Sequence, residues 1–305
     1  TLGLYPLLEN DHCFLLAVDF DEQDWRDDAR AFWRSCKELE VQAALEISRS
    51  GQGAHVWAFF EEAIPAKDAR RLGAALISHT CAATRQLQLS SYDRLFPNQD
   101  AMPKGGFGNL IALPLQKEPR QRGCSVFVDD ALEPYADQWA YLASLQRMTA
   151  SAVEQVIQSA TGEAHPLDLS FIDAEDLATP WQASSPLPKL HGTLPASLRL
   201  TLADQLYVER TGLPQPLVNR LVRLAAFANP AFYKAQAMRL SVWNTPRVIG
   251  CAENFPQHIA LPRGCMEAVQ TLLEEQGIQA DLVDERQCGS ALNLTFAGQL
   301  RQDQD

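Results

Sequence analysis

One apolar run near the start of the chain constrains the fold most. Residues 13–21, Cys-Phe-Leu-Leu-Ala-Val-Asp-Phe-Asp, are almost wholly apolar until they end in two acids one residue apart. Such a short run between polar flanks predicts a buried β-strand rather than a helix. Because alternate strand residues share a face, we expect Asp19 and Asp21 to project the same way, with Cα atoms roughly 6.5 to 7 Å apart. The pair predicts either a site for a divalent cation or a solvated strand tip.

The composition narrows the class of protein. With 305 residues and 46% hydrophobic content, the chain is long enough for two domains. A net charge of −12 disfavours a general nucleic-acid coat, so any such contact is expected to be local. The seven cysteines have no CxxC spacing, which predicts neither a disulfide framework nor a zinc site and favours a reducing, cytoplasmic setting. No apolar run approaches 18 residues, so no membrane contact is predicted.

Helical and strand patterns alternate along the chain, which predicts an α+β fold. In the first half the patterns indicate helices over 25–46, 65–89 and 138–160, and strands over 13–21, 45–60 (with a turn), 87–95, 109–115 and 124–128. In the second half they indicate helices over 216–228 and 264–276, and strands over 247–251, 258–261, 280–283 and 291–296. We therefore expect a catalytic domain over 1–160, a Pro-, Ser- and acid-rich linker over 161–195 and a smaller α/β accessory domain over 196–305. The abrupt start and the polar end suggest a fragment of a longer chain.

A Gly-rich turn between two strand patterns is the second candidate for a site. Glycines allow a backbone to approach a ligand closely and to point successive N–H groups at an anion such as a triphosphate. A histidine leading the next strand could donate to a phosphate oxygen. The alternative is a plain hairpin with a half-buried histidine. The candidate nucleotide-binding residues here are Ser48, Arg49, Ser50, Gly51, Gly53 and His55.

A third acid would complete a site for two metal ions. Asp93 lies in a strand-like segment, where an acid has low propensity. It is either a metal ligand or an edge-strand acid paired with a nearby arginine. Asp129, after another apolar run, competes for the same role. A second Gly-rich turn from Lys104 to Asn109 either wraps the nucleotide or is an ordinary loop.

These blocks occur in the order acid-x-acid, Ser-Gly-x-Gly-x-His, acid, each on its own predicted strand. The sequence motifs at residues 16–21, 48–57, 92–100 and 105–114 resemble those of the archaeo-eukaryotic primase superfamily. Within that superfamily they resemble the TOTE-type branch of bacterial conflict systems, which is fused to a superfamily 2 helicase. The resemblance covers residues 4–145. Residues 229–236 and 259–264 also resemble the segment that precedes the helicase in that branch. No GxxxxGK[ST] motif is present, so the helicase itself is expected elsewhere in the polypeptide.

The resemblance implies roles for the candidate residues. Asp19, Asp21 and Asp93 would hold two Mg²⁺ or Mn²⁺ ions, while Ser50 and His55 would bind the phosphates of an incoming nucleotide. It also implies a primase core in which a small αβ unit faces an RRM-like unit. We add Lys104 and Asn109 as further candidates for binding the nucleotide. Many primases carry a zinc module, for which this chain has no cysteine spacing, so de novo priming is left open beside extension.

Basic residues predict where a nucleic acid would lie. No acid occurs between Glu209 and Glu253, although arginines, lysines and aromatics do. This block is either a phosphate-binding face with stacking aromatics or an ordinary solvated face over a core. A second group flanks the predicted catalytic strands. The candidate nucleic-acid-binding residues are Lys117, Arg120, Arg122, Arg220, Arg223, Lys234 and Arg239.

Together these features predict a metal-dependent, template-directed nucleotidyltransferase. Its partners would be nucleoside triphosphates and single-stranded or primed DNA, with RNA as the alternative strand. Two other interpretations stay open: a two-metal nuclease, and a non-catalytic module that binds nucleotides or DNA for an attached helicase. The preference for ribo- or deoxynucleotides is not predicted.

Overall fold

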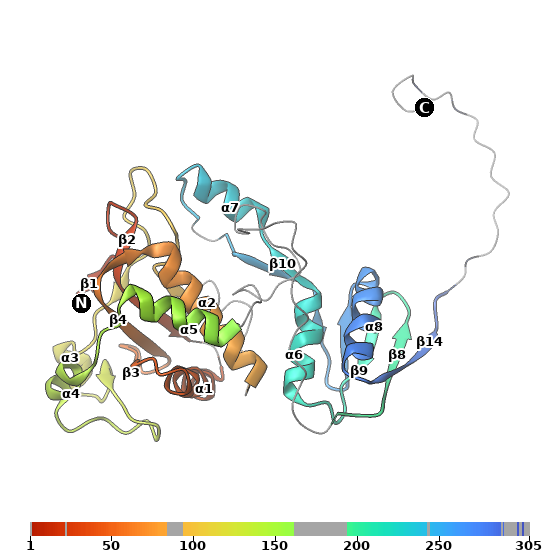
Figure 1. The fold of residues 1–305 in the computed structure, drawn as a ribbon, viewed down its shortest axis with the longest axis horizontal. Helices are drawn as coiled ribbons and strands as arrows, with labels where there is room; N and C mark the ends of the chain where they lie inside the picture. Colours follow the sequence, from red (N-terminus) through yellow and green to blue (C-terminus); the bar gives the residue numbers. More distant parts are fainter. Residues whose placement is uncertain are drawn as a thin grey trace.

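The computed structural model shows two five-stranded sheets, each with its own hydrophobic core (Figure 1). Two short strand pairs, β1 with β6 and β10 with β11, accompany them. Helices and largely antiparallel sheets form an α+β fold, which confirms the predicted class. The structure describes residues 2–21, 23–83, 94–161, 194–242, 245–287, 289, 298 and 301.

The first sheet has the strand order β5-β2-β4-β3-β7, and all its neighbours are antiparallel. Its strands are β2 (His12–Phe20), β3 (Ala44–Ile47), β4 (Ala54–Pro65), β5 (Leu95–Phe96) and β7 (Val126–Phe127). The predicted apolar run thus lies in β2, between β5 and β4, and is largely buried.

The two faces of this sheet are covered differently. Alternate residues of β2 and β4, such as Leu16, Val18 and Val56, share one core with helices α1 (Trp25–Glu38), α2 (Ala66–Ala83) and α5 (Ala150–Thr161). The intervening residues, such as Ala17 and Trp57, face the other side, in a second apolar cluster with Ile111 and Leu115. That side is covered by β1 (Gly3–Leu4), β6 (Ile111–Ala112), α3 (Lys117–Arg120) and α4 (Gln138–Ser144).

Two predicted helices are shorter than their apolar patterns. The helix expected over 25–46 ends at Glu38, because Glu40 adopts a left-handed φ of 59° and Val41 N–H turns back to the Cys36 carbonyl (2.8 Å). The helix expected over 138–160 is two helices, α4 and α5. Between them the chain is extended, and Met148 exchanges hydrogen bonds with the backbone of β4. A local cap thus ends the first helix, whereas a contact with β4 interrupts the second helical pattern.

The second sheet has the order β12-β13-β9-β8-β14, with β14 parallel to β8 and the other pairs antiparallel. Leucines and valines of β8 and β9 pack with α6 and α8 in a separate core. The elements are β8 (Ser197–Leu202), β9 (Leu206–Glu209), α6 (Gln215–Leu224), β12 (Glu253–Asn254), β13 (His258–Leu261), a 3₁₀ turn (Arg263–Cys265), α8 (Met266–Glu275) and β14 (Gln279–Asp284).

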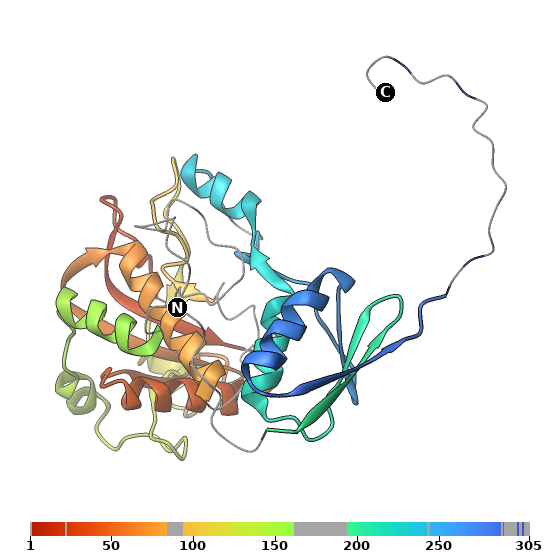
Figure 2. The same ribbon diagram turned by 45° about the vertical axis from the view of Figure 1, so that its right-hand side comes forward.

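A segment of the second half reaches back to the first sheet. The helix expected over 216–228 ends at Leu224, and the chain continues as β10 (Ala226–Ala228), α7 (Pro230–Ala237) and β11 (Val248–Gly250). Ala226 and Val248 belong to the core of the first sheet. Helix α6 lies between the two sheets (Figure 2). It contacts α2, where Asn219 of α6 donates a hydrogen bond to the Cys81 carbonyl.

Some predicted segments fall outside the described residues. These are most of the strand expected over 87–95, most of the linker expected over 161–195 and the strand expected over 291–296. Among the helices that the structure describes, none has the length and apolar character needed to cross a membrane.

Candidate functional site

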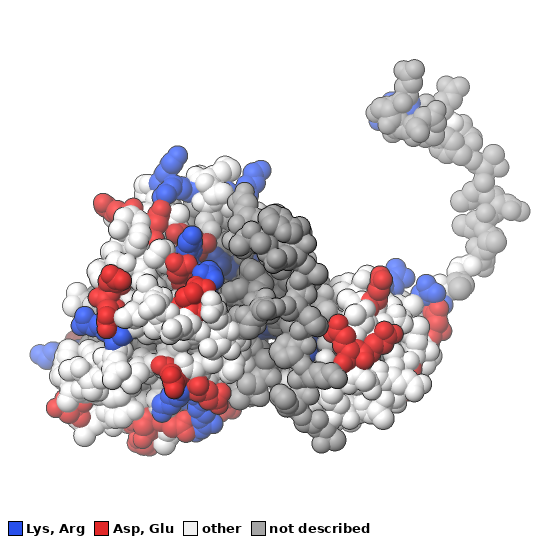
Figure 3. Space-filling view, viewed as in Figure 1, with Lys and Arg blue, Asp and Glu red and all other residues white. Residues whose placement is uncertain are grey.

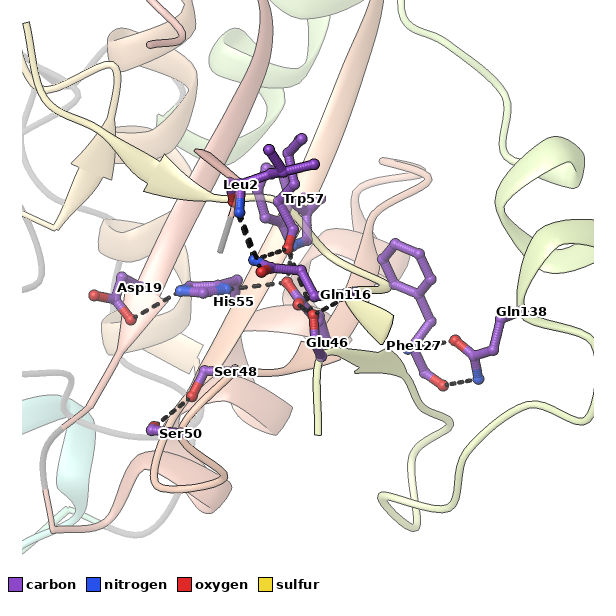
Figure 4. A network of polar contacts seen from close by, with 12 residues as sticks. Leu2, Asp19, Glu46, Ser48, Ser50, His55, Trp57, Gln116, Phe127 and Gln138 are labelled. Carbon is purple, nitrogen blue, oxygen red and sulfur yellow. Dashed lines mark hydrogen bonds and ion pairs between the residues drawn. The ribbon is translucent and has the colours of Figure 1, made fainter. Parts of the chain in front are cut away.

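Three side chains form a polar line across the first sheet (Figure 4). Asp19 near the end of β2 is directly opposite His55 on β4, and His55 is opposite Glu46 on β3. The His55 ring lies between the two carboxylates, with Nε2 at 3.5 Å from Asp19 Oδ1 and Nδ1 at 3.0 Å from Glu46 Oε2. Because the three residues face the same side of neighbouring strands, the register of the sheet itself creates this line.

Glu46 is the buried anchor of the line, and the sequence analysis missed it. Its carboxylate accepts hydrogen bonds from Trp57 Nε1 (2.7 Å) and Ser125 Oγ (3.3 Å) as well as facing the His55 ring. A buried carboxylate requires such partners, because burial without them costs several kcal/mol. The signal in the sequence was an acid inside the apolar strand Ala44–Ile47, whose partners only the sheet register identifies.

The surroundings of His55 favour its charged form. Burial alone lowers the pKa of His55, but the hydrogen bond and the charge of Glu46 raise it, and Asp19 and Asp21 add to that effect. The net pKa lies above the usual 6.5. The two acids therefore favour the protonated, positively charged form of His55. A protonated histidine is suited to donate a hydrogen bond to an anionic ligand.

Asp19 and Asp21 share a basic partner. Arg94, just before β5, places Nη1 at 2.9 Å from Asp21 Oδ2 and at 3.9 Å from Asp19 Oδ2. Its carbonyl also accepts the Asp19 N–H (3.0 Å). Burial raises the pKa of Asp19 and the charge of Asp21 raises it further, whereas His55 and Arg94 oppose the rise. The net pKa of Asp19 lies above its usual value, as expected for a buried carboxylate whose negative charge is not fully neutralised by its neighbours.

The predicted Gly-rich turn joins β3 to β4 beside these acids. Gly51 has a positive φ of 75°, and a Cβ at Gly53 would stand 2.7 Å from the Phe20 carbonyl oxygen of β2. The Ser48 and Ser50 hydroxyls lie 2.9 Å apart, and Ser50 Oγ accepts the Gln52 N–H (3.1 Å). The turn therefore packs tightly against the end of β2 that carries the acids. Arg49 lies on the same turn and is exposed.

Which residue lies close enough to be the third acid depends on which strand neighbours β2. Asp93 lies outside the described residues; the next residue in the sequence, Arg94, is described and contacts both Asp19 and Asp21. Asp129 follows β7, three strands away from β2 and thus roughly 14 Å across the sheet. Its Oδ1 accepts the N–H groups of Ala131 (2.8 Å) and Glu133 (3.0 Å), which closes a turn. Asp129 therefore has a local structural role, away from Asp19.

The side chains at this point provide only part of what a divalent metal requires. Mg²⁺ and Mn²⁺ prefer carboxylate oxygens, which Asp19 and Asp21 supply. Their mutual repulsion and the pairing with Arg94 show that positive charge is needed at this point. Within the described part of the chain, no group of three or more His, Cys, Asp or Glu side chains is arranged to hold a metal ion. The two acids fit a metal of this class as a partial ligand set.

Two residues predicted to bind the nucleotide are placed elsewhere. Lys104 N–H donates to the Arg239 carbonyl, and Arg239 pairs with Asp11 (2.7 Å), which immediately precedes β2. Asp19 is near the other end of that strand, roughly 25 Å away along extended chain. Asn109 uses its side-chain amide on the backbone, accepting from Asn98 N–H (3.2 Å) and donating to the Leu95 carbonyl (3.3 Å). Lys104 is thus not brought to the site, and Asn109 fastens a loop to β5.

The predicted nucleic-acid-binding residues are also divided by the structure. Arg223 is buried and donates to Ser78 Oγ of α2 (3.3 Å), so it contributes to internal packing and is not available to a phosphate backbone. Arg239 is engaged with Asp11. The aromatic Phe232 is buried, with Arg247 stacked 4.9 Å from its ring centroid. Part of the block between Glu209 and Glu253 therefore forms an internal interface.

Other predicted cations are more accessible. Lys117, Arg122 and Lys234 are exposed, whereas Arg120 and Arg220 are partly buried. Figure 3 shows basic and acidic side chains interspersed over the visible face of the first half, with acidic atoms gathered on the part that holds α8. Among the described residues, no continuous basic stripe crosses this visible face.

A comparison with known protein families covers the half of the chain that contains this site. A family model for the TOTE conflict system, Archaeo-Eukaryotic Primase domain, matches residues 1–156, which is just over half of the 305-residue chain. No curated protein matches the chain in a sequence search. The family is one of primases and nucleotidyltransferases, typically dependent on divalent metals, and the domain type implies binding of nucleotides and nucleic acid. The resemblance seen in the sequence is confirmed, and the chain belongs to the archaeo-eukaryotic primase domain family of TOTE conflict systems.

Proposed function

We propose that this chain is a metal-dependent, template-directed nucleotidyltransferase that extends the 3′ end of a nucleic acid. One observation carries the proposal: the Asp19–His55–Glu46 line ends at the same edge of the sheet as Asp21 and the turn between β3 and β4. This edge therefore brings together acids that suit a metal, a histidine whose charged form is favoured and a turn with backbone N–H groups. These are the groups that transfer of a nucleotide from a triphosphate requires.

Asp19, Asp21 and Asp93 are proposed to hold two divalent ions. Bound Mg²⁺ or Mn²⁺ would activate the attacking 3′ hydroxyl and neutralise the departing pyrophosphate. The neighbouring strands β2 and β5 support this choice of third acid, because Asp93 precedes Arg94, which contacts both other acids. Arg94 neutralises the acids in the absence of metal and would turn to the phosphates when an ion takes its place.

The turn residues are proposed to bind the triphosphate. The turn beside Asp21 contains Ser48, Arg49, Ser50, Gly51 and Gly53, and His55 is the second residue of the following strand β4. His55 would donate from Nε2 to a phosphate oxygen, since Nδ1 faces Glu46. Glu46 acts through His55: it orients the ring and maintains its positive charge.

A primer-extension assay tests this proposal. A labelled primer on a longer template is incubated with each nucleotide type and with Mg²⁺ or Mn²⁺. We expect the wild-type chain to extend the primer, and Asp19→Asn or Asp21→Asn to reduce the rate about a hundredfold or more. Asp27→Asn is the matched control, because Asp27 is an exposed acid on α1, away from the sheet edge.

The same assay separates the other two interpretations. Shortening of labelled single-stranded DNA without nucleotides would identify a nuclease. Nucleotide binding without incorporation, under every metal and nucleotide type, would identify a non-catalytic module. Unchanged extension by Asp19→Asn would contradict the proposed site directly.

The domain organisation follows as part of the proposal. Residues 1–160 would form the catalytic domain, and residues 196–305 an accessory domain that precedes a helicase in the full polypeptide. The separate core of β8, β9, α6 and α8 supports a distinct second unit. The segment β10–α7–β11 packs on the first core. It would therefore couple the position of the accessory domain to the catalytic domain.

A further inference from the structure

Four large apolar side chains that flank β1 and β6 are exposed to solvent. They are Leu2, Tyr5, Phe107 and Leu110, with exposed fractions of 72%, 45%, 68% and 55%. The Tyr5 and Phe107 rings are 5.3 Å apart between centroids. Leu110 contacts Gly3, where a Cβ would stand 3.0 Å from its Cδ1. We call these four residues the β1–β6 platform, because β1 and β6 carry or adjoin them.

The platform is not part of the core below it. In the β1–β6 ladder, Leu4 pairs with Ile111, and both pack into the cluster formed with Ala17 and Trp57. The platform residues flank this ladder and remain accessible to solvent. Contiguous exposed apolar side chains are uncommon on a soluble surface unless they bind something.

The platform lies on the same side of the sheet as the candidate site. Asp19 and His55 lie two residues from Ala17 in β2 and from Trp57 in β4, so all four point to the face that the β1–β6 ladder covers. The helices α1, α2 and α5 occupy the opposite face. A strand of nucleic acid bound to the platform would therefore run along the face on which the site opens.

A chain of contacts leads from one end of the platform to the site. Leu2 N–H donates to Gln116 Oε1 (3.2 Å), and Gln116 N–H donates to Ser125 Oγ (3.2 Å). Ser125 Oγ then donates to Glu46, the residue that holds His55. Figure 4 shows Leu2 beside Gln116, to which it is hydrogen-bonded.

Cations flank both ends of the platform. Lys117 follows Gln116 at the end near the site, and Lys104 precedes the turn that carries Phe107 at the far end. Both lysines are exposed. Aromatic rings between cations that can bind phosphates are the arrangement by which proteins bind single-stranded nucleic acid with little sequence preference. The same pattern fits an acidic, unpaired strand better than an apolar protein partner.

We propose that the β1–β6 platform binds the unpaired template strand as it approaches the site. Tyr5 and Phe107 stack on its bases, while Lys104 and Lys117 bind its phosphates. Describing the strand as a template rests on the proposed function. The binding itself requires no chemistry, so it is measured without metal or nucleotide.

Fluorescence anisotropy with a labelled single-stranded oligonucleotide tests the platform. We expect Tyr5→Ala combined with Phe107→Ala to weaken binding on the order of tenfold, because each stacked base contributes substantially to affinity. Phe107→Leu, which keeps apolar bulk but loses the ring, should lie between this variant and wild type. Trp139→Ala is the matched control: Trp139 is 60% exposed on α4 and lies outside the platform.

Two further measurements distinguish stacking from charge. On an oligonucleotide of abasic sites, wild type and the double variant should bind equally, because no bases remain to stack. Lys104→Gln and Lys117→Gln should each reduce the salt dependence of log K by about 0.7, whereas the aromatic variants should leave that slope unchanged. Circular dichroism verifies that each variant is folded.

Each outcome decides for or against the platform. Wild-type affinity of the double variant would overturn the proposal. So would a change in oligomeric state by gel filtration with unchanged DNA binding, since it would identify a self-association surface. The proposed function fails separately, if wild type binds the strand through the platform but extends no primer.

Discussion

At the scale of single residues, the site depends on one buried acid. Glu46 connects three partners that come from β4 and from the segment before β7: His55, Trp57 and Ser125. Its negative charge raises the pKa of His55 against the effect of burial. Because this pairing fixes both the orientation and the charge of the ring, Glu46 controls His55 without reaching the ligand itself.

Glu46→Gln is therefore expected to lower the pKa of His55. Glutamine is nearly isosteric but neutral, so burial is opposed by less negative charge and the pKa falls from above 6.5 towards or below that value. An NMR titration of the His55 ring nitrogens measures the change. Glu61→Gln serves as the control, since Glu61 is exposed on β4. An unchanged His55 pKa in Glu46→Gln would rule out this role.

At the scale of elements, the turn between β3 and β4 and the end of β2 are fitted to each other. Gly53 is adjacent to the Phe20 carbonyl, and Ser48 N–H donates to the Gly53 carbonyl (2.9 Å). The absence of a side chain at Gly53 lets the turn approach the segment that carries Asp19 and Asp21. The glycine thus has a structural reason that is independent of any bound phosphate.

Gly53→Ala is expected to destabilise the fold and to displace the acids. The new Cβ would stand 2.7 Å from the Phe20 oxygen and 3.4 Å from Asp21 Cα, so backbone must move. We expect a loss of about 1–3 kcal/mol in the free energy of unfolding, measured with urea. Gly264→Ala is the matched control, because a Cβ there meets no atom within 4 Å. Equal stability of the two variants would show that the turn has room to relax.

At the scale of the whole molecule, a partly buried acid joins the two halves. Asp100 lies between β5 and β6 and contacts Arg70 of α2 (3.3 Å). It also contacts Arg247 before β11 (3.7 Å) and accepts from Gln236 Nε2 of α7 (2.8 Å). Burial raises the pKa of Asp100, but Arg70 and Arg247 lower it by more, so its net pKa is below the usual 3.8. The charged form stabilises the packing of α7 and β11 on the first sheet.

Asp100→Asn is expected to cost about 1–3 kcal/mol of stability at neutral pH. A carboxyl group whose pKa is lowered in the folded state stabilises the protein above its unfolded pKa and loses that effect as the pH falls through its folded pKa. The difference between variant and wild type should therefore shrink below pH 3.8. Urea midpoints over a pH series measure it. Asp130→Asn, which removes an exposed pair with Arg34, should change stability by less than about 1 kcal/mol.

Much of the fold and of the site could be predicted from local sequence. The apolar run before Asp19 and Asp21 forms β2, and the glycines between two strand patterns form the turn beside it. These predictions succeed because strand alternation and the conformational freedom of glycine act over a few neighbouring residues. The order of these blocks was also sufficient to identify the family that the comparison confirms.

What only the tertiary structure decided was the pairing of distant residues. Glu46 and Ser125 meet at the site although 79 positions separate them, and Arg223 is buried against α2 although its sequence surroundings indicate an exposed basic face. Lys104 begins a Gly-rich pattern similar to that of the first turn but lies near the opposite end of β2. The physical reason is that register and packing select partners across the sheet and between the two halves, and the sequence neighbours of a single residue do not identify those partners.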